Sequence, residues 1–280
     1  MPFKDVLIAL STYPDPTPFV AIDQGTDFAA TFNARISAIA CAIEVRAPGH
    51  VLADTLLGFS TMAAAVTQKS AQQAEALLRV FEETARKRGV FQERILEHCL
   101  VTEVPNLLTQ YARTKDLSIV PVPEEGLHDQ WYAESVIFGS GRPTLVMPHT
   151  KKRSFPLNAV LIAWDFSRPA ARAVADALPI LRQAKKTSIL IVTNEKNLDS
   201  DHLGSELQKH LQCHGIEAVL ETVDAGGRSI GDVLRNSVES KNADLLVMGA
   251  FGHSRIRDFV LGGATKSIIA QPPIPIFLSH

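Results

Sequence analysis

The sequence predicts an α/β protein with two tandem doubly wound domains, each containing a five-stranded, mostly parallel sheet. Short apolar runs typical of strands buried on both faces alternate with helical patterns along the 280 residues. Such alternation produces a parallel sheet covered by helices on both faces, because each crossover returns right-handed over the sheet. The plan occurs twice, since residues 6–9 match residues 160–163 (both VLIA) and residues 116–120 (DLSIV) match residues 244–248 (DLLVM). These matches indicate an internal duplication.

The first half contains two recognisable strands, at residues 6–9 and 116–120. A long helix between them ends near Arg88. An additional apolar segment rich in small residues, at positions 48–65, precedes this helix. It could be a lid, a partner surface or a long crossover between strands.

A polar, basic stretch, PHTKKRS, occupies residues 148–154 between the two halves. Exposed polar segments of this kind commonly join domains. We therefore place the boundary near Thr150, which gives domains at residues 1–150 and 151–280.

The second half shows the alternation most clearly. It opens with the apolar run 159–163, and Asp165, Phe166 and Ser167 end that strand. Ser167 is a suitable helix N-cap, and Pro169 lies in the first helical turn. The elements expected after this first strand are a helix from Ser167 to Leu181, strand 188–192, helix 201–214 closed by Gly215, strand 218–223, helix 229–240, strand 244–248, a last helix and strand 274–278.

Composition places the chain among soluble globular proteins, with 46% hydrophobic and 21% charged residues. A formal net charge of -2 creates no strong global field, so neither a nucleic-acid partner nor an anionic membrane is predicted. The three cysteines are far apart and lack CxxC spacing, which argues against a zinc site or a disulfide framework. With neither a signal-peptide pattern nor an apolar run of membrane-spanning length, we expect a cytoplasmic location.

A glycine-rich loop follows the strand at residues 244–248, with the spacing G-x2-G-x9-G. In doubly wound sheets, ligands bind beyond the carboxyl ends of the strands, where the winding reverses. The first two glycines allow a tight turn close to an anion, and the next residues open a helix whose N–H groups favour phosphate. A threonine hydroxyl adds a further donor. The residues concerned are Gly249, Gly252, Gly262, Gly263, Ala264 and Thr265.

This loop resembles the signature of the universal stress protein family, whose domains often bind ATP through G-x2-G-x9-G followed by Ser or Thr. The whole chain resembles the tandem form of that family. The resemblance implies a Rossmann-like, adenine nucleotide alpha hydrolase-like fold that binds ATP, with Mg²⁺ accompanying it. It also implies that Asp165 contacts the adenosine end, that the backbone of Val192 reads the adenine edge, and that the glycine-rich loop cradles the phosphates.

Two features of the loop qualify this resemblance. Gly263 occupies the place after the third glycine where ATP-binding members usually have Ser or Thr, so one hydroxyl contact is missing. His253 and Arg255 lie between the second and third glycines, where Arg255 or Arg257 could reach a terminal phosphate. A solvated loop is the alternative interpretation of these residues.

The first half lacks the same signature. Aligned without a gap from the shared Asp-Leu, Pro121 replaces Gly249, Glu124 replaces Gly252, Glu134 replaces Gly262, Ser135 replaces Gly263, and Ser11 replaces Asp165. Proline removes a backbone donor and the two carboxylates would repel phosphate. The sequence therefore predicts one functional and one degenerate nucleotide site.

No catalytic or metal site is evident in the sequence. His210 and His214 are four residues apart on an expected helix, but no third ligand is nearby in sequence. No P-loop and no oriented Ser-His-Asp triad occur. We thus expect a stress-response protein that binds an adenine nucleotide without strong catalysis. The alternatives are a slow ATP hydrolase, or an interaction protein without nucleotide in which residues 48–65 contact a partner or lipid-like ligand. In the family, final strands commonly pair across a dimer, so the two halves could pair in this way within one chain, with homo-oligomers possible beyond it.

Overall fold

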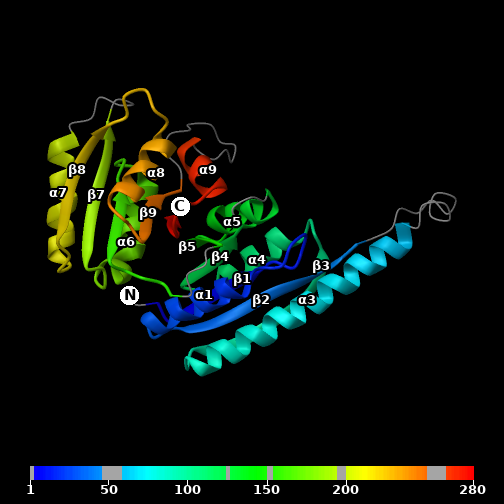
Figure 1. The fold of residues 1–280 in the computed structure, drawn as a ribbon. Helices are drawn as coiled ribbons and strands as arrows, with labels where there is room; N and C mark the ends of the chain where they lie inside the picture. Colours follow the sequence, from blue (N-terminus) through cyan, green and yellow to red (C-terminus); the bar gives the residue numbers. More distant parts are fainter. Residues whose placement is uncertain (1–2, 46–58, 124–126, 150–153, 194–199, 251–262) are drawn as a thin grey trace.

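The computed structural model describes residues 3–45, 59–123, 127–149, 154–193, 200–250 and 263–280. Strands and helices alternate through these residues, which confirms the α/β class predicted from the sequence (Figure 1). The first half comprises β1 (Asp5–Leu10), α1 (Phe19–Thr31), β2 (Arg35–Glu44), α3 (Phe59–Lys87), β3 (Phe91–Leu100), α4 (Val104–Ala112), β4 (Leu117–Val122), α5 (Leu127–Gly139) and β5 (Thr144–Pro148). The second half comprises β6 (Ala159–Ala163), α6 (Arg168–Leu181), β7 (Lys186–Thr193), α7 (Ser200–Cys213), β8 (Ala218–Asp224), α8 (Ile230–Ser240), β9 (Leu245–Gly249), α9 (Gly263–Ala270) and β10 (Ile276–Ser279).

The strands in the described part of the chain form one ten-stranded sheet, in the order β3-β2-β1-β4-β5-β10-β9-β6-β7-β8. Neighbouring strands within each half are parallel. The halves meet where β5 and β10 pair antiparallel, with Ile276 opposite Val146 and Leu278 opposite Thr144. Two five-stranded sheets are thus joined through their last strands.

Each strand at the centre of a half is buried on both faces. Val6 and Ile8 of β1 belong to one hydrophobic core, and Leu7 and Ala9 belong to the other, because successive side chains of a strand point to opposite faces. Helices α1, α3, α6 and α7 cover the first face, whereas α4, α5, α8 and α9 cover the second. This double burial explains why β1 reads as a continuous apolar run.

Local capping fixes where two helices of the second half begin. The Ser167 hydroxyl accepts a hydrogen bond from the Ala170 amide at 3.2 Å at the start of α6, where Pro169 lies in the first turn. Ser229 plays the same part for α8 and accepts from the Asp232 amide at 3.2 Å. These contacts satisfy amides that have no partner within the helix.

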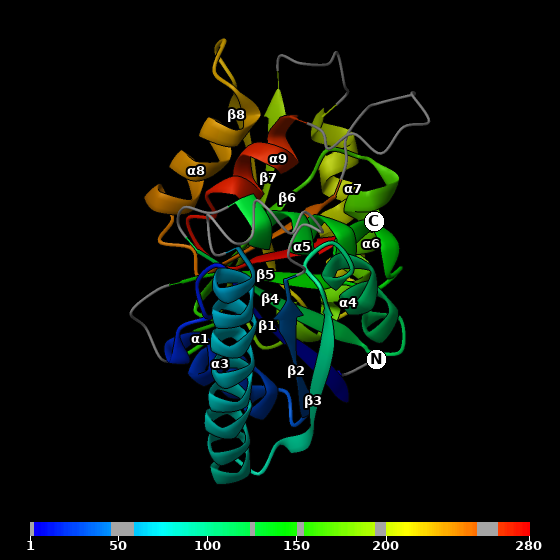
Figure 2. The ribbon, with the colours of Figure 1, turned by 90° about the vertical axis from the view of Figure 1, so that its right-hand side faces the viewer.

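Helix α3 is the crossover that connects β2 with β3. Residues 59–65 of the apolar segment belong to its first turns, whereas residues 48–58 lie outside the described part of the chain. Figure 2 shows α3 running along β2 and β3. Its buried face includes Ala74, Leu77 and Phe81, whereas among the described side chains of residues 59–65 only Ala63 is buried and Met62 is 64% exposed. Residues 59–65 therefore belong to the crossover, but burial against the sheet does not account for their apolar composition.

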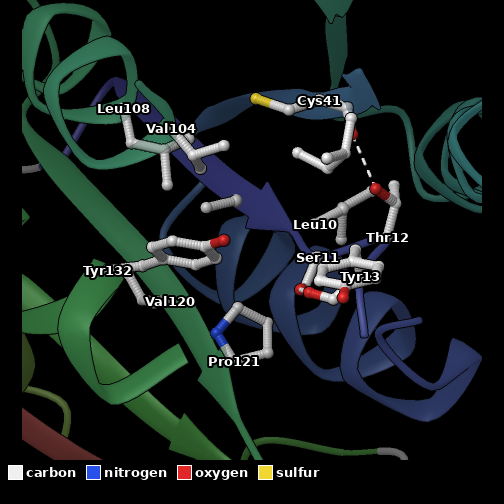
Figure 3. Close-up of a pocket in the computed structure, with 12 residues that line it drawn as sticks. Leu10, Ser11, Thr12, Tyr13, Cys41, Val104, Leu108, Val120, Pro121 and Tyr132 are labelled. Atoms are coloured by element: carbon white, nitrogen blue, oxygen red, sulfur yellow. Dashed lines mark hydrogen bonds between the residues drawn. The ribbon is translucent and has the colours of Figure 1, made fainter. Parts of the chain in front are cut away.

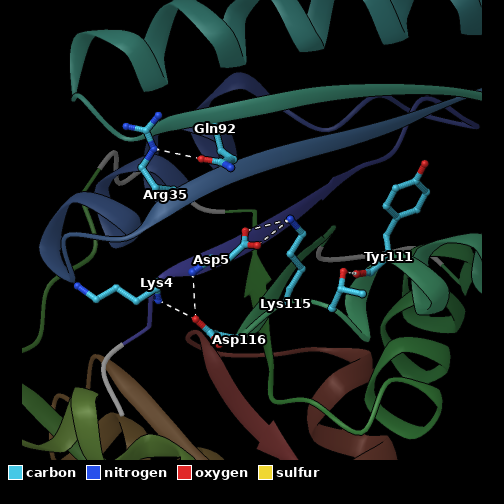
Figure 4. Close-up of polar contacts among 8 residues, drawn as sticks. Lys4, Asp5, Arg35, Gln92, Tyr111, Lys115 and Asp116 are labelled. Atoms are coloured by element: carbon cyan, nitrogen blue, oxygen red, sulfur yellow. Dashed lines mark hydrogen bonds and ion pairs between the residues drawn. The ribbon is translucent and has the colours of Figure 1, made fainter.

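One aspartate in each half ties the start of the central strand to its neighbour. Asp116 Oδ2 accepts hydrogen bonds from the amides of Lys4, at 2.8 Å, and Asp5, at 3.0 Å (Figure 4). Asp244 Oδ2 accepts equivalent bonds from the amides of Asn158, at 2.8 Å, and Ala159, at 3.2 Å. The shared Asp-Leu of the two halves therefore makes the same contact twice.

A cluster of phenylalanines links the halves near the β5–β10 junction. Phe277 of β10 is fully buried, and its ring centroid lies 6.3 Å from that of Phe3 in the first half. Phe155, which precedes β6, packs edge-on against Phe28 of α1 at 5.1 Å, and its amide donates to Asp27 Oδ2 at 2.7 Å. One core thus extends across both halves.

His149, directly after β5, should make the protein sensitive to acid. Burial lowers the pKa of its imidazole to about 4, and Nε2 has no hydrogen-bond partner among the residues that the structure describes. Between about pH 6.5 and pH 4 the unfolded chain binds this proton and the folded chain does not, so stability falls as the pH falls through that window. At the lower end of this pH window, the shifted pKa lowers the free energy of unfolding by about 3 kcal/mol.

The substitution His149→Phe should remove this pH-dependent loss of stability, because phenylalanine does not titrate. Urea unfolding at pH 7.5, 6.0 and 4.5 would measure the free energy of unfolding of both proteins. We expect the loss between pH 7.5 and 4.5 to be smaller in the variant by 2 to 3 kcal/mol, on the order set by the pKa shift. Equal losses in the two proteins would contradict the assignment.

Candidate nucleotide-binding site

The residues predicted to bind a nucleotide lie at the carboxyl ends of β6, β7 and β9. The sheet winds in opposite directions from β6 and β9, which are neighbours, so the crevice between them is the switch point of the second half. Asp165 follows β6, Val192 lies near the end of β7, and Gly249 ends β9. Gly263 opens α9. The structure therefore brings these four predicted residues to one edge of the sheet.

Gly249 is required by the packing of this edge. A Cβ added there would lie 2.4 Å from the Ala170 nitrogen and 2.6 Å from the Pro169 carbonyl carbon. Both neighbours are backbone atoms in the first turn of α6. The end of β9 thus touches the start of α6, a second reason for glycine besides the anion approach predicted from the loop.

Asp165 is held by a local turn. Its Oδ1 accepts a hydrogen bond from the Ser167 amide at 3.0 Å, and Phe166 between them has the left-handed φ of 61°. Asn and Asp side chains stabilise such turns by bonding to the backbone two residues on. Asp165 is partly exposed, and the position of its carboxylate is fixed by the backbone that starts α6.

The start of α9 presents open space at one position. Among the residues that the structure describes, a Cβ at Gly263 would meet nothing within 4 Å, and the glycine is exposed. Thr265, two residues later, is only 2% exposed, so its hydroxyl lies inside the fold. Helix N-termini attract phosphate through unpaired N–H groups and the helix dipole. A side chain at position 263 is therefore better placed to meet a ligand at this end than Thr265 is.

The structure does not describe all of the remaining residues that were predicted to bind the nucleotide. Gly252, His253, Arg255 and Gly262 lie outside the described residues. Ala264 is described only as part of the backbone of α9. The proposed phosphate cradle is thus defined by its two ends, Gly249 and the first turn of α9.

Glu134 makes the switch point of the first half different from a phosphate-binding site. This α5 residue corresponds to Gly262, and burial raises the pKa of its carboxyl, while a hydrogen bond from Gln130 at 2.9 Å and the charge of Lys266 act in the opposite direction. The side chain is partly buried, so it is not simply a solvated helix residue.

Sequence reasoning assigned no role to three residues around the corresponding crevice of the first half. Thr12, Tyr13 and Tyr132 line a cavity there. Their positions after β1 and in α5, at the same switch point, are the signal that could have identified them.

His210 lies in α7, and His214 directly follows the end of that helix. The rings of His210 and His214 lie 4.8 Å apart at 72°, and His214 Nδ1 lies 3.1 Å from the Arg182 guanidinium. Among the described residues, no group of three or more His, Cys, Asp or Glu side chains could hold a metal ion. None of the described helices is both long and apolar enough to cross a bilayer.

Comparisons with known proteins agree with this architecture. A universal stress protein of Synechocystis is 27% identical over 145 residues, which span 51% of this chain and 48% of that protein's length. A solved universal stress protein from Archaeoglobus fulgidus superposes with a TM-score of 0.72 at 17% identity, over 98% of this chain and 95% of that one. A protein from Pseudomonas aeruginosa gives a TM-score of 0.57 at 11% identity, over 99% and 93%. At these identities the two structures show the fold alone.

The universal stress protein family profile matches residues 157–280, the half that carries the glycine-rich loop. This match covers β6 to β10 and therefore every residue of the candidate site. Residues 157–280 are thus similar to the universal stress protein family, and the match covers slightly less than half of the chain.

Proposed function

We propose that this protein is a regulatory stress-response protein that binds ATP in its C-terminal half. The observation that carries the proposal is the convergence of Asp165, Gly249 and the first turn of α9 at one switch point. An anchored carboxylate and an open helix N-terminus suit the two ends of a nucleotide, the sugar hydroxyls and the phosphates.

Each site residue has a part in this proposal. Asp165 contacts the adenosine end, and the backbone of Val192 reads the adenine edge. Gly249, Gly252 and the residues from Gly262 to Thr265 cradle the phosphates, with His253 and Arg255 approaching the terminal phosphate. Mg²⁺ enters together with ATP. The N-terminal half, residues 1–150, is a degenerate tandem copy that leaves nucleotide binding to residues 151–280, and the protein acts in the cytoplasm.

Gly263→Ser tests this proposal by restoring the hydroxyl that the chain lacks. No atom of the described part of the chain lies within 4 Å of a Cβ at position 263, so these residues leave room for the side chain. One added hydrogen bond to a charged phosphate should tighten ATP binding about three- to tenfold. Isothermal titration with Mg·ATP would measure the dissociation constants of the wild type and the variant.

Two further variants make the test specific. Gly263→Ala introduces the same Cβ without the hydroxyl, so its affinity should stay within about twofold of the wild type. Gly252→Glu places a carboxylate in the loop and should abolish binding through repulsion of phosphate. If neither the wild type nor Gly263→Ser binds ATP, the proposal fails and the interaction-protein alternative gains support. Release of phosphate above the Gly252→Glu background would instead favour the slow hydrolase.

A further inference from the structure

A row of exposed cations follows the edge of the sheet at which the strands of the first half begin, here called the amino edge. Strands β2, β1, β4 and β5 are neighbours in that order, and a basic residue stands at or shortly before the start of each. Adjacent strands lie about 4.8 Å apart, so the four strand starts span roughly 14 Å. The four residues, all exposed, are Arg35, Lys4, Arg113 and Arg142.

The charges of this row are not compensated within the described part of the chain. None of the four side chains takes part in an ion pair among the described residues. Arg35 Nε donates to Gln92 Oε1 at 3.2 Å (Figure 4). Arg113 Nε donates to the Gly139 carbonyl oxygen at 3.2 Å, and Arg142 Nε donates to the Arg113 carbonyl oxygen at 3.3 Å. Each contact uses one of the five N–H donors of a guanidinium and leaves its charge in place.

The acidic residues at the starts of β1 and β4 are engaged with other groups. Asp5 pairs with Lys115 at 2.9 Å, and Asp116 Oδ2 accepts hydrogen bonds from the amides of Lys4 and Asp5. Figure 4 shows the Lys4 side chain extending away from both carboxylates. These acids therefore do not neutralise the row.

The second half builds the same edge structure with different side chains. The Arg35 amide donates to the Lys4 carbonyl oxygen at 2.8 Å, and the Lys186 amide donates to the Asn158 carbonyl oxygen at 2.9 Å. Lys4 therefore corresponds to Asn158, and Arg35 corresponds to Lys186. The backbone contact forms whether or not the first residue carries a charge.

The other two cations of the row also lack an uncompensated counterpart. Arg113 corresponds to Lys241, which pairs with Glu221 of β8. Arg142 corresponds to Ile274, because each is followed by a proline whose carbonyl oxygen accepts an equivalent bond from the neighbouring strand. Since the second half folds in the same way with Asn and Ile at two of these positions, the fold does not require the row.

The surroundings of the row favour an anion that has neither bases nor acyl chains. Proteins that bind single-stranded nucleic acid stack bases on aromatic rings, and helices that bind membranes insert apolar side chains. The exposed rings of the first half, Phe19 and Trp131, lie in the first turns of α1 and α5, which start from the other edge. Tyr13 and Tyr132 line the small cavity at that other edge (Figure 3). Among the described residues of the amino edge, no large apolar side chain is exposed.

We propose that this row, formed by Lys4, Arg35, Arg113 and Arg142, binds inorganic polyphosphate. A linear chain of phosphates matches cations repeated at the strand spacing, and guanidinium and ammonium groups are the usual partners of phosphate. The inference does not depend on ATP binding in the second half. Because β5 and β10 are antiparallel, however, the row and the proposed nucleotide site share one edge of the sheet, so the test must separate them.

The test measures binding of fluorescently end-labelled polyphosphate to the intact chain by anisotropy, without Mg²⁺. We expect saturable binding at low salt that weakens steeply as salt is added. With four phosphate contacts, each contributing about 0.7 as on a single-stranded nucleic acid, the logarithm of the association constant should fall with the logarithm of the salt concentration with a slope of about -3.

The double variant Lys4→Asn, Arg142→Gln removes two of the four charges at positions where the second half has uncharged residues. Its affinity should be at least fivefold lower, and its salt slope should shrink to about -1.5, a change that a merely structural role would not produce. Lys186→Gln removes a charge at the matching position of the other half and should stay within twofold of the wild type. Gly263→Ser alters the proposed nucleotide site and should also stay within twofold.

Circular dichroism checks that the double variant is folded. If it is not, Lys4→Asn alone carries the test, with an expected loss of about threefold and a slope smaller by about 0.7. The proposal is overturned if polyphosphate does not bind saturably, if removal of the row's charges changes neither affinity nor slope, or if Gly263→Ser shifts the affinity instead. Equal or tighter binding of oligothymidylate or of phosphatidylglycerol vesicles would overturn it in favour of a nucleic acid or a membrane.

Discussion

Replacing Phe277 with alanine should lower the free energy of unfolding by about 4 kcal/mol, the range for a fully buried phenylalanine. Phe277 lies in β10, opposite Leu145 of β5, and its ring packs near that of Phe3. The variant leaves a void where the two halves share a core. We expect the thermal midpoint to fall by roughly 10 °C, measured by circular dichroism.

The same experiment tests whether the junction unites the halves. Phe91 provides the matched control, because it lies on edge strand β3, is only partly buried, and packs against Phe81 and the Arg86 guanidinium. Phe91→Ala should cost less than half as much as Phe277→Ala. If the two variants lose equal stability, the shared core is not the dominant link between the halves.

Gly249→Ala should destabilise the protein by about 3 kcal/mol, at the upper end of typical overpacking costs. The added Cβ would meet two backbone atoms of α6, at 2.4 and 2.6 Å, and backbone atoms cannot move aside as a flexible side chain can. Relief of the contact requires the end of β9 to separate from α6. We therefore expect ATP affinity to fall as well, because the same shift moves the first turn of the proposed cradle.

Gly263→Ala is the control for Gly249→Ala, because it makes the same substitution at a different position. It adds the same methyl group at the other end of the loop, where no atom of the described residues lies within 4 Å. Because alanine favours helix over glycine, the variant should be neutral or more stable by up to about 1 kcal/mol. Chemical denaturation would measure both variants, and an equal loss in the two would rule out the steric explanation.

Much of the fold could be predicted because its signals are local. The strand expected at residues 159–163 matches β6 at both ends, and Ser167 occupies the predicted N-cap position. The helix expected at residues 229–240 is α8, with Ser229 as its N-cap. Double burial makes the central strands continuous apolar runs, which the chain displays directly. The fold class and the resemblance to universal stress proteins are both confirmed.

Other features depend on contacts between distant residues and leave no local pattern. Asp116 and Asp244 were recognised as matching strand starts, but their bonds to the amides before β1 and β6 span 86 to 112 positions. The cavity around Tyr132 likewise combines residues of several elements. In the sequence, none of these residues stands out from ordinary core or loop residues. Only the folded sheet shows that they line a common cavity.

The antiparallel pairing of β5 with β10 has a consequence for communication between ligands. The strands of the two halves run in opposite directions, so their carboxyl ends lie at opposite edges of the sheet. A ligand bound at the carboxyl ends of one half would therefore lie at the other edge of the sheet from a ligand bound at the carboxyl ends of the other half. Any effect of one on the affinity of the other is a coupling free energy that must be reciprocal. The contacts that join the halves, and so could transmit it, include the β5–β10 pairing around Phe277 and the packing of Phe155 against Phe28.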